Sequence, residues 1–338
     1  MSKSAVDWQA LHGDSFSGNR VLITGGAGFI GSHLAEVLVS LGAIVVVLDD
    51  LSGGDRQNLS SFGPVEFVEG SILDPKTVAT CMAGCSYVFH QAALGSVPRS
   101  VGLPRLYHEV NTTGTLNVLE AARQSGVRRV MFAASSSAYG DNRVPWVESM
   151  PVSPMSPYAA TKAAGEALLR AYSSSYGLDT ASLRYFNVFG PRQNANSAYA
   201  AVIAAFAKAL LAGQSPVIYG DGDQSRDFTF IDNVVHANLL AARCATPIGG
   251  KVLNVGCGGR ISVNELERAI AAMLGRPDLQ PRYQAERAGD LKHSFADLTR
   301  TRSILGYEPI TDFESGLAQT VAWYRSVLAP TLQQVVLT

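Results

Sequence analysis

A tyrosine and a lysine four residues apart could carry acid–base chemistry in this chain of 338 residues. Tyr158 and Lys162 follow Ser156-Pro157, a pair typical of a helix N-terminus, so both side chains should leave one face of a predicted helix over 157–176. A phenol titrates near pH 10, about three units too high for a base at neutral pH. A neighbouring ammonium favours the phenolate, so we expect Lys162, together with a second positive charge in the site, to lower the pKa of Tyr158 until it can take a proton from a hydroxyl group.

Two serines upstream could assist this tyrosine. Ser135 and Ser136 follow an apolar run over residues 129–134 that predicts a buried strand. Either hydroxyl could bind a reacting hydroxyl group and pass its proton to Tyr158. A tyrosine and a lysine at this spacing also occur on ordinary surface helices, so the pair indicates a site only together with other signals.

A glycine-rich turn is the strongest of these signals. Residues 21–24 form an apolar run that predicts a strand, and apolar positions recur at helical spacing from Ile30 to Leu41. Between them stand Gly25, Gly26, Gly28 and Gly31. Glycine permits a tight turn, and without a Cβ atom the backbone can approach a pyrophosphate at the positive end of the helix. Strand, turn and helix together are typical of a dinucleotide-binding fold, although a tight turn without a ligand could carry the same glycines.

A carboxylate indicates which dinucleotide is bound. The second predicted strand, residues 44–48, is followed by Asp49. At this position a carboxylate accepts hydrogen bonds from the adenosine ribose. Its charge would repel a 2′-phosphate, so the sequence favours NAD over NADP.

Composition excludes several other classes of protein. The chain is 47% hydrophobic and 16% charged, with a formal net charge of -1, so no nucleic-acid-binding surface is expected. No apolar run approaches the length of a membrane span, and residues 1–19 lack the apolar stretch of a signal peptide. The four cysteines show no CxxC spacing, so we expect no metal site and a cytoplasmic protein.

The remaining pattern predicts the fold. Further strands are expected over residues 65–69, 87–90, 129–134, 181–185 and 252–255, with helices over 76–82, 106–124 and 157–176. Apolar strands alternating with helices predict an α/β fold of the Rossmann type, a doubly wound parallel sheet, and the length of the chain allows a smaller C-terminal α/β domain. We assign residues 1–186 and 221–256 to the sheet domain and residues 187–220 and 257–338 to the smaller one.

Eight motifs in the chain resemble those of a known family. They are TGGAGFIGSHL, LDDLS, HQAA, SSSAYGD, SPYAATK, RYFNVFGPRQ, GDGDQSRDF and RAGDLKHS, and they extend from residue 20 to about residue 325. In combination they resemble the extended short-chain dehydrogenase/reductase superfamily, specifically its NAD-dependent nucleotide-sugar 4-epimerases. The resemblance implies hydride transfer from C4 of the sugar to a tightly held NAD, a 4-keto intermediate that flips, and return of the hydride.

The resemblance also implies roles for individual residues. Tyr158 would be the base, Lys162 would hold the nicotinamide ribose, and Ser135 and Ser136 would bind the substrate hydroxyl. The expected NAD contacts are Gly25, Gly28, Phe29, Ile30, Gly31, Asp49, Asp50, Ser71, Ile72, Gln91, Ala92, Ala93, Asn111, Tyr158, Lys162, Tyr185, Asn187 and Val188. Ser71 departs from the family, which usually has an aspartate there near the adenine.

The resemblance further implies that the substrate is a UDP-sugar and that the smaller domain binds it. Its expected contacts are Gly95, Ser96, Ser136, Tyr158, Asn187, Gln193, Tyr199, Ala200, Ala201, Val217, Tyr219, Arg226, Arg287, Asp290 and Ser294. Arginines suit a diphosphate because a guanidinium donates two parallel hydrogen bonds. An ion pair of Arg226 with Asp223 or Asp227, or of Arg287 with Asp290, is the structural alternative.

One position bears on the choice of sugar. Epimerases restricted to simple hexoses carry a bulky aromatic residue where this chain has Ser294, and a small residue leaves room for a 2-acetamido group. The chain is most similar to the bacterial epimerases of UDP-N-acetylglucosamine (UDP-GlcNAc) and UDP-N-acetylgalactosamine (UDP-GalNAc). The positions that enclose the sugar in that subgroup are matched here by Gly95, Ser136, Asn187, Gln193, Ala201 and Ser294. A UDP-glucose/UDP-galactose epimerase, a UDP-uronate epimerase in which Arg99 or Arg192 faces the carboxylate, and a non-catalytic NAD-binding regulatory or scaffold protein remain alternatives.

The family resemblance implies a homodimer held by a four-helix bundle. The helices predicted over 106–124 and 157–176 carry catalytic residues on one face, and we expect Leu116, Leu119, Leu168 and Leu169 on their outer faces. Packing within one chain would explain the same leucines.

Overall fold

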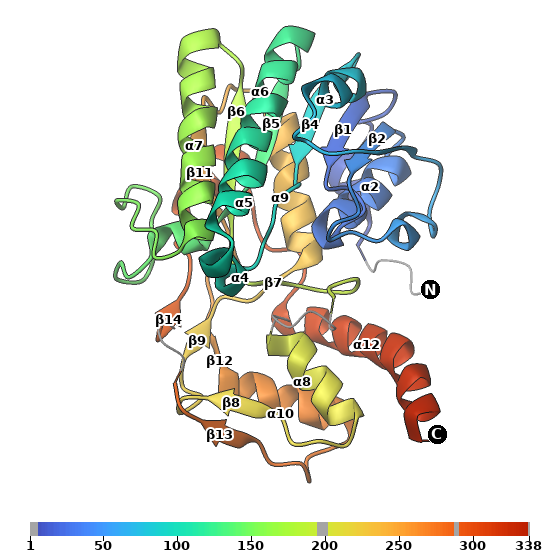
Figure 1. Ribbon diagram of the computed structural model, residues 1–338, viewed down its shortest axis with the longest axis vertical. Coiled ribbons are helices and arrows are strands. Elements are labelled where there is room, and N and C mark those ends of the chain that lie inside the picture. Colours follow the sequence, from blue (N-terminus) through green and yellow to red (C-terminus); the bar gives the residue numbers. More distant parts are fainter. Residues whose placement is uncertain (1–5, 195–201, 287–290, 337–338) are drawn as a thin grey trace.

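Seven parallel strands form the central sheet of the protein, in the order β11-β6-β5-β4-β1-β2-β3. The computed structural model describes residues 6–194, 202–286 and 291–336, with side chains described to residue 328. The strands are β1 (Arg20–Thr24), β2 (Ile44–Asp49), β3 (Glu66–Glu69), β4 (Tyr87–His90), β5 (Arg129–Ser135), β6 (Thr180–Tyr185) and β11 (Lys251–Val255). The predicted Rossmann-type fold is confirmed (Figure 1).

Helices cover both faces of this sheet because its strands are apolar on both sides. One face packs against α2 (Phe29–Ser40) and α9 (Ile231–Arg243), and the other against α3 (Pro75–Met82), α6 (Gly114–Ser125) and α7 (Pro157–Tyr176). Within β1, Val21 and Ile23 join the first of these cores, whereas Leu22 joins the second. The alternation of side chains along a strand thus supplies both layers.

The helix predicted over 106–124 is more complex than expected. The chain forms α4 (Val97–Gly102), then α5 (Pro104–His108), a π-helical turn over Glu109–Thr113, and then α6. Two of the four leucines expected on outer faces are misplaced, because Leu119 and Leu169 are fully buried in the core between the sheet and its helices. Leu116 is exposed, as expected.

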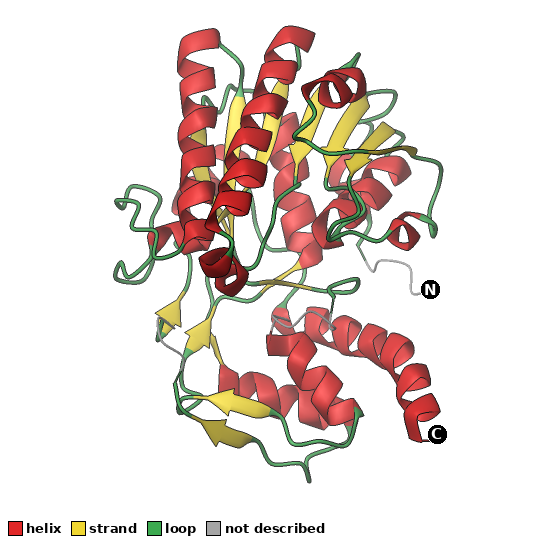
Figure 2. Cartoon of the chain, in the orientation of Figure 1, coloured by secondary structure: helices red, strands yellow, loops and turns green. Residues whose placement is uncertain are grey.

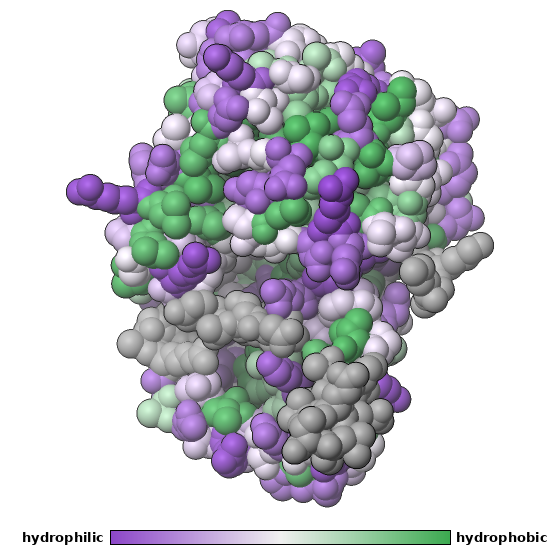
Figure 3. Space-filling view, turned by 45° about the vertical axis from the view of Figure 1, so that its right-hand side comes forward, coloured by the Kyte–Doolittle hydropathy of each residue, from purple (hydrophilic) through white to green (hydrophobic). Residues whose placement is uncertain are grey.

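A smaller part of the chain lies beyond the carboxyl ends of the strands (Figures 1 and 2). Its elements are α8 (Val202–Leu211), β8 (Val217–Tyr219), β9 (Ser225–Arg226), β12 (Ile261–Ser262), α10 (Val263–Leu274), β13 (Arg282–Gln284), β14 (His293–Ser294) and α12 (Phe313–Val336). The paired strands β7 (Val188–Phe189) and β10 (Thr229–Phe230) lie at the boundary. On the face shown in Figure 3, the surface is hollowed between the two parts. The residue limits of the two domains remain a prediction.

Two shorter helices complete the fold. The first, α1 (Trp8–His12), packs on α9 through a contact between His12 and His236, and the other, α11 (Thr299–Leu305), lies against β11 and α9. None of the helices among the described residues is long and apolar enough to span a membrane.

Candidate active site

At the glycine turn, the backbone approaches both the segment after β4 and the first turn of α2 closely. Gly25 has φ +69°, and a Cβ atom there would lie 2.7 Å from the Cα atom of Ala92. A Cβ atom on Gly31 would lie 2.2 Å from the carbonyl oxygen of Gly25. Gly28 is the N-cap residue of α2, whose first N–H groups are thereby left for a ligand.

A cavity of about 410 Å³ opens over this turn. Sixteen of its lining residues were predicted from the sequence: Gly25, Gly28, Phe29, Ile30, Gly31, Asp49, Asp50, Ile72, Gln91, Ala92, Ala93, Gly95, Ser96, Tyr158, Lys162 and Tyr185. The structure therefore brings the glycine turn, the ends of β2 and β4, and the predicted base of α7 to one cavity.

Asp49 ties β2 to the glycine turn. Its two carboxylate oxygens accept hydrogen bonds of 2.9 Å from the backbone N–H groups of Ala27 and Leu51. Burial raises the pKa of Asp49, and these two hydrogen bonds oppose that effect. Each carboxylate oxygen can accept a further hydrogen bond, so the predicted contact with a ribose is compatible with these bonds.

Ser71 and Asn111 were predicted to bind the cofactor, but neither is among the described residues that line the cavity. The Ser71 hydroxyl accepts a hydrogen bond of 3.2 Å from the backbone of Leu73. Asn111, in the π-helical turn, binds both backbone polar groups of Leu94 and donates to the Thr161 hydroxyl at 3.0 Å. Asn111 thus fastens the loop after β4 to helix α7.

Tyr158 and Lys162 stand at the start of α7, as predicted. The hydroxyl of Ser156 caps this helix by accepting a hydrogen bond of 3.2 Å from the backbone of Ala159. The Nζ atom of Lys162 donates to the carbonyl oxygen of Ala133 at 2.7 Å and lies 5.9 Å from the centre of the Tyr158 ring. Both side chains therefore converge on the end of β5.

The pKa values of this pair correct one expectation. Burial lowers the pKa of Lys162 to about 7, against a smaller opposite effect of Glu166. Burial also raises the pKa of Tyr158, and the hydrogen bond with Ser135 offsets only part of this rise. The pKa of Tyr158 is thus raised in this structure, not lowered as expected, because burial outweighs the hydrogen bond with Ser135.

The two predicted serines continue β5 into a turn. Ser135 is the last residue of the strand, and its hydroxyl lies 2.8 Å from that of Ser137. Ser136 opens the 3₁₀ turn over Ser136–Tyr139. The side chains of Ser135, Ser136 and Ser137 are half-buried. Ser135 is thus the serine that the structure joins to Tyr158.

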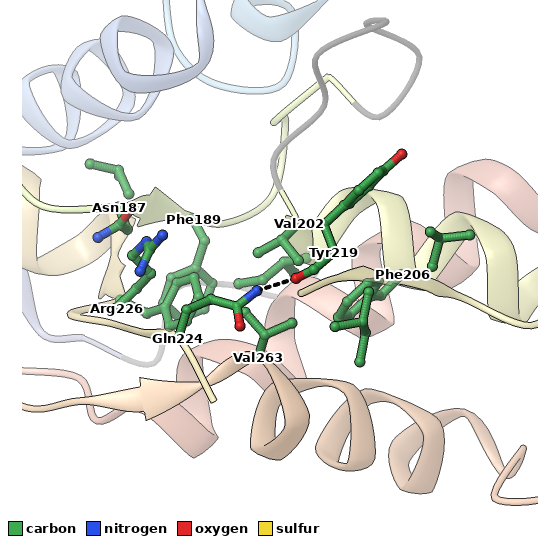
Figure 4. A pocket seen from close by; sticks show the side chains of 13 residues that line it. Asn187, Phe189, Val202, Phe206, Tyr219, Gln224, Arg226 and Val263 are labelled. Atoms are coloured by element: carbon green, nitrogen blue, oxygen red, sulfur yellow. Dashed lines mark hydrogen bonds between the residues drawn. The ribbon is translucent and has the colours of Figure 1, made fainter. Parts of the chain in front are cut away.

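A second cavity, of about 270 Å³, lies within the smaller part of the chain. Five predicted residues line it: Asn187, Val188, Val217, Tyr219 and Arg226. Figure 4 shows Asn187 and Arg226 at one end of this cavity and mainly apolar side chains along the rest. Asn187 and Val188 were also predicted to contact the cofactor, and both line this second cavity and are not among the described residues that line the first.

Arg226 is held by the backbone around it. Its Nη1 atom donates to the carbonyl oxygens of Ser225 at 2.9 Å and Lys292 at 3.4 Å. The neighbouring Asp227 is committed elsewhere, because its carboxylate accepts hydrogen bonds from the backbone N–H groups of Cys257, Gly258 and Ala296. Burial raises the pKa of Asp227 to about 6.

Two residues predicted to enclose the sugar converge on the segment after β6. Ser294 is buried, and its hydroxyl lies 3.5 Å from the amide Nδ2 of Asn187. The side-chain amide of Gln193 donates to the carbonyl oxygen of Val188 at 3.0 Å. The predicted residues Tyr199, Ala200, Ala201, Arg287 and Asp290 lie outside the part of the chain that the structure describes.

Comparison with known proteins places this site in a family. Residues 21–256 match the NAD dependent epimerase/dehydratase family. The UDP-glucose 4-epimerase of Mycolicibacterium smegmatis is 44% identical over 313 residues, which are 91% of this chain and 99% of the relative. The chain belongs to the NAD-dependent epimerase/dehydratase family.

Solved structures of relatives agree with this assignment. The UDP-N-acetylglucosamine 4-epimerase of Methanobrevibacter ruminantium superposes with a TM-score of 0.87 at 41% identity, covering 92% of this chain and 99% of the other. The UDP-glucose 4-epimerase of Thermotoga maritima gives a TM-score of 0.85 at 37% identity, covering 91% and 99%. The two relatives are named for different sugars.

NAD is the cofactor of the chain, and the first cavity fits it. The close approach at Gly25 and Gly31 and the uncapped N–H groups of α2 form a cradle for a pyrophosphate. At the end of β2 the Asp49 carboxylate supplies an acceptor for a ribose.

The cavity also contains residues that the sequence analysis missed. Ser52, Gly53 and Gly54 line it beside Asp49, and their Ser-Gly-Gly sequence directly after the second strand was a usable signal. Tyr107 lines it as well, and its hydroxyl accepts a hydrogen bond of 3.2 Å from the backbone of Ser96. No sequence pattern marks Tyr107, because only the packing of α5 brings it there.

Of the two arginines weighed for binding a uronate, only Arg99 belongs to this cavity. Arg192 instead pairs with Glu36 and donates to the hydroxyl of Ser32 at 3.4 Å. Both partners lie on α2. Arg192 is therefore held against α2 in this structure.

Proposed function

We propose that this protein is a reversible NAD-dependent 4-epimerase of UDP-hexoses, with UDP-GlcNAc and UDP-GalNAc as its substrates. One observation carries the proposal: Tyr158 and Lys162 line the same cavity as the glycine turn. A non-catalytic NAD-binding protein would have no need of that arrangement. The epimerase names of the relatives agree with it.

In this account Tyr158 is the base. Its phenolate form, which the positive charge of bound NAD would favour, takes the proton of the sugar 4-hydroxyl; the resulting phenol keeps that proton while C4 is a ketone and returns it when the hydroxyl forms again. Ser135 binds Tyr158 and steadies the hydroxyl during transfer. NAD, when bound, supplies what side chains lack, the ability to accept a hydride from carbon and give it back.

Lys162 orients rather than reacts. Its hydrogen bond to the Ala133 carbonyl holds the ammonium at the end of β5, where it is placed to hold a ribose hydroxyl. Its lowered pKa brings loss of its proton close to neutral pH. We expect bound substrate and cofactor to favour the protonated form.

The second cavity would take the UDP moiety. Its apolar walls suit a flat base, and the Arg226 guanidinium suits a phosphate. Asn187 lines this cavity and also lies beside Ser294, so we infer that the sugar ring sits near these two residues. The small Ser294 leaves space there for an acetamido group.

A uronate epimerase is the second candidate. Arg99 is exposed and lines the first cavity on the side of Ser96 and Tyr107, where its charge suits a sugar carboxylate. A UDP-glucuronate that turned over faster than UDP-GlcNAc would favour this candidate.

We also propose a homodimer, formed by α6 and α7 of each copy as a four-helix bundle. Leu116 on α6 and Leu106 on α5 are each 38% exposed, and Val101 on α4 is 67% exposed. A second copy that covered these side chains would remove apolar surface from water.

Replacing Tyr158 by Phe tests the proposed function. We expect Tyr158→Phe to lose activity by at least about 100-fold, the usual contribution of a general base, while it keeps its NAD. Tyr172→Phe is the matched control. Tyr172 lies further along α7, and its hydroxyl donates to the carboxylate of Glu120 on α6. Activity above a few per cent in Tyr158→Phe would show that another group is the base.

A further inference from the structure

A continuous chain of hydrogen bonds, buried except at its two ends, runs behind the cavity from the glycine turn to the helix of Tyr158. It begins at the backbone N–H of Ala92, which donates to the hydroxyl of Thr24 at 3.3 Å. Thr24 in turn lies 2.7 Å from Nδ1 of His90, at the end of β4. The first half of the chain therefore joins the last residues of β1 and β4.

The second half crosses to α7. Nε2 of His90 lies 2.9 Å from the hydroxyl of Thr115, which donates to the Asn111 carbonyl at 2.6 Å. The Asn111 amide donates to the Thr161 hydroxyl at 3.0 Å, and that hydroxyl donates to the carbonyl oxygen of Tyr158 at 2.8 Å. The five side chains that make these hydrogen bonds are at most 5% exposed: Thr24, His90, Thr115, Asn111 and Thr161.

These bonds fix the direction of every proton in the chain. Because Thr115 uses its single hydrogen on Asn111, it must accept from Nε2–H of His90. Nδ1 then has only a lone pair, so Thr24 donates to it and accepts from Ala92. Burial and the charge of Lys162 lower the pKa of His90 to about 3, so the neutral ring that this pattern needs is the form present.

Both ends of the chain reach the cavity. Ala92 and Tyr158 line it, whereas His90 and Thr115 are not among its described lining residues. A side chain that touches neither ligand can still affect catalysis if it fixes the distance between the groups that do.

We propose that Thr115 and His90 are positioning residues: with Thr24, Asn111 and Thr161 they hold the first turn of α7, and thus the Tyr158 phenol, in register with the dinucleotide-binding turn. The proposal rests on the proposed function, since it concerns the alignment of the base with the cofactor. The chain of bonds acts on the backbone of Tyr158, and the substrate does not enter it.

Replacing Thr115 tests the chain at its centre. Thr115→Val keeps the shape of the side chain but removes both bonds of the hydroxyl, and Thr115→Ser restores them. Thr180→Val is the matched control, because Thr180 is also buried and donates to the Leu169 carbonyl of α7 at 3.0 Å, at the amino end of β6. All three variants would be compared as holoenzymes with the wild type.

We expect kcat of Thr115→Val to fall by about 10- to 100-fold, with KM for the UDP-sugar unchanged, because misplacement by about 1 Å has an effect of this size. Thr115→Ser should recover most of the loss, and Thr180→Val should keep the wild-type kcat. Amide hydrogen exchange should quicken over residues 157–162 in Thr115→Val and stay unchanged there in Thr180→Val. If Thr115→Val does not fold, Thr161→Val is measured in its place.

Two results would overturn the proposal. One is wild-type kcat and exchange in Thr115→Val, and the other is an equal loss of kcat in Thr115→Val and Thr180→Val, which would mark a general loss of stability. The exchange measurement needs no turnover, so it tests the chain of bonds even if the wild type converts none of the UDP-sugars and the proposed function fails.

Discussion

The side-chain amide of Asn187 lies 3.5 Å from the hydroxyl of Ser294, although 107 positions separate the two residues. The same amide donates to the Asp227 carbonyl at 3.1 Å, and Ser294 pairs in register with Arg226 between β14 and β9. Residues from three distant segments thus meet where the second cavity begins. The size of the side chain at position 294 should therefore affect the space for the sugar.

Ser294→Tyr tests this relationship. We expect turnover of UDP-GlcNAc to fall by about 10- to 100-fold, since a large side chain at this buried position would crowd Asn187 and the acetamido group. Turnover of UDP-galactose should persist, because that sugar carries only a hydroxyl group at C2. Both rates would be measured by product analysis, with Ser294→Ala as a control that adds no bulk. Unchanged turnover of UDP-GlcNAc would remove Ser294 as the determinant of sugar choice.

Glu166 should set the alkaline limit of activity. It stands four residues after Lys162 on the buried face of α7, and its carboxylate makes two hydrogen bonds of 2.7 Å with Arg184. The charge of Glu166 raises the pKa of Lys162, while burial lowers it to about 7. Glu166→Gln removes the raising effect, so the pKa of Lys162 should fall further and its ammonium should be lost at lower pH.

The pH profile of kcat measures this effect. Its alkaline limb should move to lower pH in Glu166→Gln, whereas Glu267→Gln, a buried glutamate on α10, should leave the limb in place. Breaking the pair with Arg184 should also cost about 3–5 kcal/mol of stability, so the assay is run well below the unfolding temperature. An alkaline limb that stays in place would show that Glu166 does not control Lys162.

Leu116→Glu tests the proposed dimer. A charge at this exposed position on α6 would be buried by a second copy without a partner, which opposes association. We expect sedimentation to give the mass of a dimer for the wild type and of a monomer for Leu116→Glu. Val327→Glu, an exposed position on α12, should remain dimeric. A wild type that sediments as a monomer, or a Leu116→Glu that stays dimeric, would contradict the four-helix bundle.

Local patterns in the sequence predicted the sheet and the glycine turn well. Apolar runs and their glycine or proline limits depend on neighbouring residues, so the limits of β4 and α7 were predicted correctly. The site residues that line the first cavity follow from the rule that ligands bind beyond the carboxyl ends of parallel strands.

Features that depend on distant contacts were not predictable in this way. The π-helical turn around Asn111 comes with side-chain bonds to Leu94 and Thr161, which are 17 and 50 positions away. Leu119 and Leu169 fit an outer helix face as well as an inner one until their neighbours are known. The lowered pKa of Lys162 likewise arises from burial, which the spacing of Tyr158 and Lys162 does not reveal.

The most direct test of the proposed function follows the products of the wild-type protein by proton NMR. UDP-GlcNAc and UDP-glucose would be supplied separately, with and without added NAD. We predict that UDP-GalNAc forms, and forms faster than UDP-galactose. The reverse order would keep the 4-epimerase and overturn the choice of sugar, and no conversion of either sugar with NAD present would contradict the central claim.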